Sequence, residues 1–400
     1  MYRIYLDGAA NTPLDKKVFE KMKKVMPGYF GNSFATHEFG IRSMKIVEEA
    51  RNKIANNLCV DSDQVYFTSG ATESNNWVLK SLFLDELRKE KQYNNYCAKK
   101  RIIVSAIEHS SILHCCADLE KLGADIVYIY PDKKGHITPT ILKKAITQDT
   151  LITAVMAVNN EIGTANPVNT LAKIAHKYES YFLADCTQMI SYGGKYVELG
   201  KIFPDVDYMS FSGHKIYGPT GIGCLIVGEN SPVYSFISGG AQELGKRGGT
   251  SNIAGIVGIS EAIETIHKRD DYIRYEKLYE YFVEKTKDLN IVKINFVPDH
   301  KNIISIRLLV PNRRKKNLPS EITIANELDM EGVACSASSA CDSSGETEEA
   351  PLSHVLINLG MKADDIKDTV RISMTRFTSK KDINILIDKI ENIVNNWKGE

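Results

Sequence analysis

Two patterns of hydrophobic and polar positions alternate between about residues 40 and 230. Segments with the helical spacing of apolar residues are followed by short runs that are apolar almost throughout. The first pattern predicts helices over residues 40–58, 71–90, 109–122, 138–147 and 167–178. The second predicts strands over residues 64–68, 101–105, 125–130, 151–158, 181–184, 208–211 and 222–227. Strands that are apolar on both faces and separated by helices are typical of an α/β fold with a mostly parallel central sheet and helices on both sides.

The pattern changes after about residue 268. A charged helix over residues 270–288 precedes two short strands, residues 292–296 and 302–307, and another helix is expected from Ser320. This segment is typical of a smaller α+β domain. We therefore predict a large domain of residues 16–268, and a small domain formed by residues 1–15 and 269–400.

Composition and charge narrow the classes of protein. A chain of 400 residues with 43% hydrophobic and 25% charged residues is an ordinary globular protein, which excludes the disordered and fibrous classes. Lys+Arg and Asp+Glu are both 50, so no global positive field attracts nucleic acid or an acidic membrane surface. No apolar stretch approaches the ~20 residues that span a bilayer, and the first residues are not a secretion or transit signal. We expect a cytoplasmic protein that binds neither nucleic acid nor membrane.

The eight cysteines are expected to be reduced, because the chain is long and carries no secretion signal. No Cys-x-x-Cys pair occurs, and we therefore expect no structural metal site.

Polar residues gather where the predicted strands end, which is where ligands bind in parallel sheets. Residues 67–74 run from a strand into a helix through small residues, a pattern that suits a phosphate at the helix N-terminus but also an ordinary helix cap. His109 follows a second strand, and a lone histidine there is commonly structural. Asn160 follows a third strand. A fourth is followed by Asp185 and Gln188.

Lys215 lies at the end of a further strand, flanked by Ser212 and His214. An amine at the mouth of a parallel sheet, near an acid and a phosphate cradle, suggests a Schiff-base lysine. Pyridoxal 5'-phosphate needs this set of an amine, a carboxylate for its ring nitrogen and an anchor for its phosphate. Each element has an ordinary structural explanation, but together they favour an enzyme that uses this cofactor.

The segment of about residues 336–352 carries Cys341 and has almost no bulky apolar side chain. It is expected to be a surface loop that presents one thiol, although an incidental surface thiol gives the same pattern. Four acidic residues between positions 342 and 349 should raise the pKa of this thiol. Activation would then come from the cofactor, from a base such as His109 or from closure of the loop.

Motifs along nearly the whole chain resemble those of the cysteine desulfurases, the NifS/IscS-like class I group of the fold-type-I pyridoxal-phosphate enzymes in the class V aminotransferase family. The motifs are Tyr5–Pro13, Thr68–Ser74, Asn159–Gly163, Ser212–Lys215, Gly239–Glu243, Arg247–Thr250, Ser339–Cys341 and Val370–Arg376. They occur in the order found in the family.

The resemblance implies roles for the residues at these motifs. Lys215 holds the cofactor and moves the substrate Cα proton, and His109 stacks on the ring and takes part in acid–base steps. Asp185 pairs with the ring nitrogen and Gln188 contacts the ring hydroxyl. Residues expected to hold the phosphate are Ala71, Thr72, Ser212, His214 and, from the neighbouring subunit of a homodimer, Thr250. Asn160 and Arg371 are expected to bind the substrate carboxylate.

The implied reaction converts L-cysteine to L-alanine and leaves the sulfur as a persulfide on Cys341. That thiol then passes sulfur to an acceptor protein, such as an iron–sulfur scaffold or a sulfur carrier, and is also a candidate transient ligand of an iron–sulfur cluster. The Cys341 loop is longer and more acidic than in short-spaced members, and we expect the protein to lack the tail that some members use to dock a scaffold. A selenocysteine lyase, another pyridoxal-phosphate enzyme such as an aminotransferase, and a non-catalytic sulfur-relay partner remain alternatives.

Overall fold

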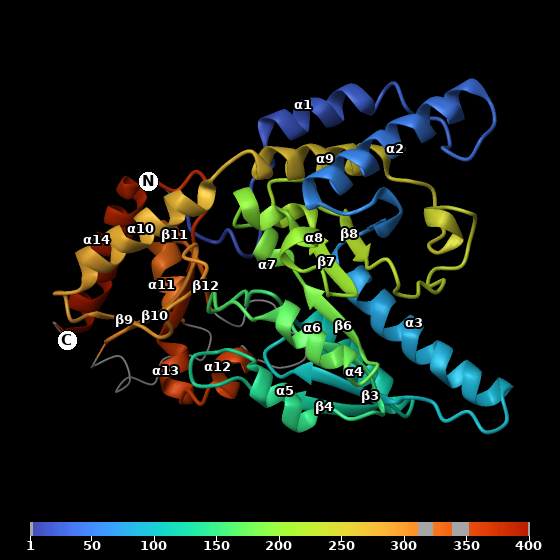
Figure 1. Cartoon of the computed structure of the whole chain (residues 1–400). Coiled ribbons are helices and arrows are strands. Elements are labelled where there is room, and N and C mark those ends of the chain that lie inside the picture. The colour runs from blue at the N-terminus through green and yellow to red at the C-terminus, as the bar shows by residue number, and fades with distance from the viewer. Residues whose placement is uncertain (1–2, 311–322, 338–351, 399–400) are drawn as a thin grey trace.

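The computed structural model describes residues 3–310, 323–337 and 352–398. Its centre is a seven-stranded sheet with the strand order β2-β8-β7-β6-β5-β3-β4 (Figure 1). The strands are β2 (Val65–Thr68), β3 (Arg101–Ser105), β4 (Asp125–Ile129), β5 (Thr150–Ala154), β6 (Tyr181–Asp185), β7 (Tyr208–Ser212) and β8 (Gly223–Val227). β8 is antiparallel to both of its neighbours, and the other neighbouring pairs are parallel. The prediction of a mostly parallel sheet is confirmed.

One predicted strand is shorter than expected. The apolar run over residues 151–158 predicted a single strand, but β5 ends at Ala154. Beyond it the chain follows β6 by donating from Val155 N to Leu183 O, and then turns where Asn159 N bonds to Thr164 O. The run is apolar because it is buried, not because all of it forms a strand, and the turn brings the following residues to the end of the sheet.

Both faces of the sheet are covered by helices because successive strand residues point in opposite directions. Phe67 and Phe182 pack in one core with α1 (Lys16–Val25), α2 (Glu38–Leu58) and α9 (Ile253–His267). Their neighbours Tyr66 and Leu183 pack in the opposite core with α3 (Ala71–Gln92) and α4 (Ser110–Lys121). Four shorter helices complete this part: α5 (Pro139–Ala145), α6 (Val168–His176), α7 (Thr187–Ile190) and α8 (Leu199–Ile202).

The C-terminal part has its own sheet and core. An antiparallel sheet has the order β12 (Ser336–Ala337), β13 (Thr369–Ser373), β10 (Ile303–Leu308) and β9 (Val292–Ile294). Its core includes residues from α10 (Asp271–Thr286), α11 (Ile324–Met330) and α14 (Lys380–Lys398). Ser320, where a helix was expected to begin, lies outside the described residues. Two short helices, α12 (His354–Asn358) and α13 (Ala363–Lys367), follow the Cys341 segment. The division into two domains at the residues given above stays a prediction.

The N-terminal segment links this second sheet to the large one. β1 (Ile4–Tyr5) pairs in parallel with β11 (Val333–Ala334). Gly8 N then donates to Ser373 O in β13, and Thr12 N donates to His214 O, just after β7. Residues 4–12, called the strap below, therefore pass from one sheet to the other across the carboxyl end of the large sheet. Over the ranges described, no helix has the length and apolar character needed to cross a membrane.

His300 lies where the two parts meet. Its ring is 3% exposed and stacks on Tyr192 with 4.1 Å between the ring centroids. The adjacent backbone N of Lys301 donates to the Tyr192 hydroxyl at 3.0 Å. Burial lowers the pKa of His300 to about 3, although the charge of Asp299 and a hydrogen bond to the backbone of Gln188 oppose the shift.

This shift predicts a pH-dependent stability. Below an ordinary histidine pKa of about 6.5, the unfolded chain takes up a proton that folded His300 does not, so stability should fall with pH down to about 3. The expected slope from this group is at most ~1.4 kcal/mol per pH unit. His300→Gln should flatten the fall, as measured by urea unfolding at several pH values, whereas His114→Gln at an exposed position should not. Equal slopes for the wild type and His300→Gln would contradict this assignment.

Candidate active site

A cleft of about 590 Å³, open to solvent, lies where the parallel strands end. Residues from separate strand ends, the strap and β13 meet in it. Those that the sequence predicted are Ala71, Thr72, His109, Asn160, Asp185, Gln188, Ser212, His214, Lys215 and Arg371. Ala9, Met156, Val158 and Thr187 also line the cleft. Side chains far apart in sequence converge here because the carboxyl ends of parallel strands share one edge of the sheet.

One end of the cleft is the N-terminus of α3. Ala71 N donates to Ser212 Oγ at 2.8 Å, which joins the start of this helix to the end of β7. A Cβ on Gly223 would lie 2.5 Å from Gly70 Cα, so a glycine is needed for β8 to approach this turn. The first amides of a helix lack partners within the helix and, with its dipole, favour an anion.

His214 is the basic side chain beside this end of the cleft. Burial, together with the charge of Lys215 and the neighbouring His109, lowers its pKa to about 4. His214 is therefore neutral at pH 7, and it can offer a hydrogen bond to an anion without adding a second buried charge.

Asp185 supplies a carboxylate near the middle of the cleft, at the end of β6, and is 6% exposed. Its Oδ1 accepts from Thr187 N at 2.9 Å and its Oδ2 accepts from Asn75 Nδ2 at 3.0 Å. These two donors hold the plane of the carboxylate in a fixed direction. Within the part of the chain that the structure describes, the buried hydroxyl of Thr187 has no hydrogen-bond partner and borders the same cleft.

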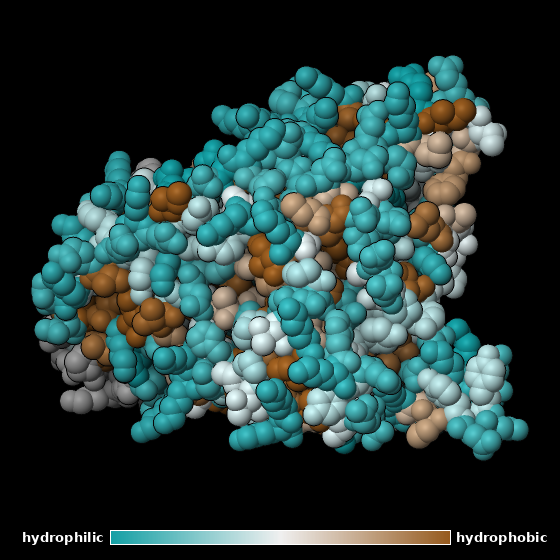
Figure 2. Space-filling view, in the orientation of Figure 1, coloured by the Kyte–Doolittle hydropathy of each residue, from teal (hydrophilic) through white to brown (hydrophobic). Residues whose placement is uncertain are grey.

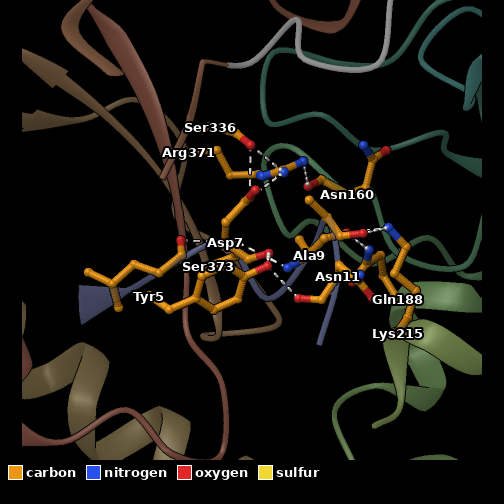
Figure 3. Close-up of polar contacts among 12 residues, drawn as sticks. Tyr5, Asp7, Ala9, Asn11, Asn160, Gln188, Lys215, Ser336, Arg371 and Ser373 are labelled. Carbon is orange, nitrogen blue, oxygen red and sulfur yellow. Dashed lines mark hydrogen bonds and ion pairs between the residues drawn. The ribbon is translucent and has the colours of Figure 1, made fainter. Parts of the chain in front are cut away.

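Lys215 follows β7 in a short 3₁₀ turn, Gly213–Lys215. Its Nζ donates to Ala9 O at 2.8 Å and to Ala10 O, both in the strap. Ala9 O also accepts from Gln188 Nε2 at 3.0 Å (Figure 3). The backbone carbonyls of the strap therefore hold the Lys215 amine and the Gln188 amide side by side.

Arg371 extends from the middle of β13 and its side chain is 3% exposed. Nη2 donates to Asp7 Oδ1 at 2.8 Å and to Ser336 Oγ at 3.1 Å, while Nη1 donates to Asn160 O at 3.2 Å (Figure 3). Ser336 Oγ also donates to Asp7 Oδ1 at 2.8 Å. Among the described residues, the buried Nε of Arg371 has no partner, so the guanidinium keeps capacity for a further acceptor.

Sequence reasoning missed several residues that shape this cleft. Asp7 lies within the Tyr5–Pro13 motif but was given no role, and its charge was the available signal. Ala9 and Ala10 act through backbone carbonyls, which leave no trace in side-chain chemistry. Asn75 has the right chemistry but follows the recognised helix start, and nothing in the sequence shows that it meets Asp185.

The two remaining predicted residues are Cys341 and Thr250. Cys341 lies outside the described residues. On the chain just after it, Ser353 Oγ donates to Glu161 Oε2 at 2.6 Å, and His354 Nε2 lies 2.9 Å from Glu108 O. Thr250 is exposed in a second cleft, bordered by Ser69, Gln242 and Arg247 among others.

Residues 4–386 match the family model described as aminotransferase class-V, and the chain belongs to this family. It is 38% identical to a cysteine desulfurase IscS of Dictyoglomus turgidum, over 98% of this chain and 94% of that protein. It is 32% identical to a cysteine desulfurase IscS of Methanosarcina thermophila, over 98% and 92%.

Solved structures agree with this placement. A NifS-like protein superimposes with a TM-score of 0.84 at 30% identity, over 98% of this chain and 99% of that one. A structure described as SspA in complex with cysteine gives a TM-score of 0.76 at 30% identity, over 94% and 99%. The predicted fold type and the predicted family are confirmed.

The contacts of Arg371 predict a large effect of removing Asp7. Asp7→Ala leaves the buried guanidinium without its counter-charge, and the free energy of unfolding should fall by about 3–5 kcal/mol. Arg371→Met added to Asp7→Ala should restore part of the loss. Chemical denaturation of the single and double variants measures this coupling.

The exposed pair Arg3–Asp329, with atoms 4.0 Å apart, is the matched control. Asp329→Ala should cost no more than about 1 kcal/mol, because exposed pairs are screened by solvent. Similar costs for Asp7→Ala and Asp329→Ala would show that Asp7 does not neutralise a buried charge.

Proposed function

We propose that this protein is a pyridoxal-phosphate-dependent cysteine desulfurase, which converts L-cysteine to L-alanine and transfers the sulfur to Cys341. The observation that carries the proposal is the convergence of Lys215, Asp185 and Arg371 in one cleft, since they supply an amine, an acid and a carboxylate-binding cation. Relatives named cysteine desulfurase cover nearly the full length of the chain. The solved relative described as a complex with cysteine supports the choice of substrate.

The chemistry of the cleft fits pyridoxal 5'-phosphate. The start of α3, which follows Gly70 and has Ser212 and His214 beside it, suits the phosphate, and Thr72 and Ala71 belong to the same turn. Asp185 would hold the ring nitrogen, and Gln188 the ring hydroxyl. Lys215 Nζ would form the bond to the cofactor aldehyde, and His109 would stack on the ring. When bound, the cofactor supplies an electron sink for the charge left after a Cα proton is removed.

The chain's own residues perform the remaining steps. Arg371 and Asn160, which both line the cleft, would bind the substrate carboxylate and thereby orient the Cα–H bond. Lys215 Nζ would act as the base that removes the Cα proton. The carbonyl oxygens of Ala9 and Ala10 accept hydrogen bonds from Lys215 Nζ. These bonds would hold the amine close to the substrate Cα.

Sulfur transfer is balanced without an added oxidant. The Cys341 thiolate attacks the substrate sulfur, the substrate Cβ–S bond breaks, and protons return to the carbon fragment as it becomes alanine. Cysteine and one protein thiol therefore give alanine and one protein persulfide. The nearby Cys335 is not suited to this step because burial, together with the charge of Asp7, raises the pKa of its thiol to about 12.

A homodimer is part of the proposal. Thr250 lines a cleft separate from the one that contains Lys215 of the same chain, which suits a residue that completes the phosphate site of a second copy. Exposed apolar side chains surround the connection between α1 and α2 (Figure 2, upper right). They include Phe30, Phe34, Phe39, Ile41 and Met44.

The persulfide would supply an acceptor protein for iron–sulfur cluster assembly or for thio-cofactor or tRNA synthesis.

Persulfide formation is the direct test. After incubation of the enzyme with L-cysteine, mass spectrometry of the Cys341 peptide should show the mass of one added sulfur atom, and alanine should accumulate. Cys341→Ser should abolish both, while Cys335→Ser should retain them. If Cys341→Ser remains active on its amino acid, the enzyme is an aminotransferase or another member of the class.

Two further readouts separate the remaining alternatives. Alanine release measured with cysteine and with selenocysteine distinguishes a desulfurase from a selenocysteine lyase, and a large preference for selenocysteine would overturn the proposal. A purified protein without the visible absorption of the bound cofactor would favour a non-catalytic sulfur-relay partner.

The oligomeric state gives another test. Phe34→Asp places a charge among the apolar side chains and should shift the protein from dimer to monomer in sedimentation velocity. Tyr93→Asp, which changes an exposed aromatic residue at the far end of α3, should leave the dimer intact. A wild-type protein that sediments as a monomer would contradict the proposed homodimer.

A further inference from the structure

Asn75 is a fully buried amide in α3, one turn after Ala71, with 0% exposure. It does not line the cleft, and the proposed mechanism gives it no role. Its side chain nevertheless contacts the polar residues behind the cleft. Nδ2 donates to Asp185 Oδ2 and to Ser111 Oγ, each at 3.0 Å, and Oδ1 accepts from Ser210 Oγ at 2.6 Å. Both amide hydrogens are therefore used.

The direction of these hydrogen bonds is set by Asp185. An ionised carboxylate can only accept, so the amide must turn its nitrogen toward Asp185 and its oxygen toward Ser210. A flipped amide would place two acceptors 3.0 Å apart in a buried site. With the amide fixed in this way, its second hydrogen points at Ser111 Oγ, which must accept it.

The same chain of donors reaches His109. Ser111 Oγ accepts from Asn75 and has its own hydrogen to give, and His109 Nδ1 lies 3.0 Å away. The backbone N of Ser111, which can only donate, is 3.1 Å from the same Nδ1. His109 Nδ1 therefore carries a lone pair, and the neutral ring carries its hydrogen on Nε2.

We propose that Asn75 is a positioning residue that couples Asp185 to His109: its amide orients the carboxylate and, through Ser111 Oγ, supports a second donor to the His109 Nδ1 that the backbone N of Ser111 already reaches. The inference rests on the proposed function in one respect, because Asp185 and His109 are there the residues that contact the cofactor ring. An apolar residue of similar size would fill the same space but would form no hydrogen bond to Asp185 or to Ser111.

The test uses the holoenzyme with ¹⁵N-labelled histidine rings and two readouts. NMR of the ring nitrogens reports the tautomer of His109, assigned by its absence in His109→Gln, and equilibrium dialysis gives the dissociation constant of pyridoxal phosphate. Asn75→Leu should weaken cofactor binding by about tenfold to a hundredfold, through the lost bond to a charged group. It should also shift the His109 Nδ1 signal, because Ser111 Oγ is no longer held in place, while the ring keeps its hydrogen on Nε2.

Two further variants separate the bond between Asn75 and Asp185 from the bond between Asn75 and Ser111. Ser111→Ala removes the hydroxyl link but keeps the bond from Asn75 to Asp185, so the ring signals should change while the dissociation constant stays within about twofold. Asn76→Ala is the matched control. Asn76 lies in the same helix and donates to Thr72 O and Ser111 O, but it does not reach Asp185 or the Ser111 hydroxyl. It should change neither readout.

Unchanged His109 signals in both Asn75→Leu and Ser111→Ala would overturn the proposal, as would equal effects of Asn75→Leu and Asn76→Ala. If Asn75→Leu does not fold, the ring signals in Ser111→Ala alone decide whether the side-chain network reaches His109. These outcomes do not depend on sulfur transfer. A wild-type enzyme that binds the cofactor but forms no persulfide would contradict the proposed function and leave this coupling intact.

Discussion

The hydrogen bonds from Lys215 Nζ to the carbonyls of Ala9 and Ala10 are the contacts on which the cleft depends. They join the end of β7 to a segment held by the other sheet, through Gly8 N to Ser373 O. Asp7, two residues earlier than Ala9, neutralises Arg371 in that second sheet. The Lys215 amine and the Arg371 guanidinium thus share one short piece of backbone, so the distance between them is set by the strap and not by loop flexibility.

Much of the fold follows from the apolar pattern because the strands are buried on both faces. The runs at Arg101–Ser105 and Asp125–Ile129 are strands almost to the residue, and α3 begins at Ala71 as its small-residue turn indicated. The antiparallel placement of β8 was not predictable, since a fully buried strand looks the same in either direction. The prediction of a single strand over residues 151–158 was wrong for a related reason. A buried segment has the same apolar composition whether or not it pairs as a strand.

The candidate site was predictable where a side chain carries the chemistry and follows a strand. Lys215, Asp185 and His109 meet that condition, and the cleft contains all three. Ala9, Ala10 and Asn75 do not, because their contributions depend on backbone direction and on partners more than 100 residues away. The roles inferred from family resemblance at Cys341 and Thr250 concern an undescribed segment and a second subunit, which the cleft of a single chain does not test.

The strap also has a consequence for how the enzyme is made. The first strand pairs with residues 333 and 334, and Gly8 bonds to residue 373, so the cleft cannot close until nearly the whole chain has left the ribosome. The large sheet can fold earlier, but without the carbonyls that receive Lys215. In a nascent chain the large sheet would therefore be folded while the Lys215 amine still lacks these hydrogen bonds. Cofactor binding would become a late step that follows the completion of synthesis.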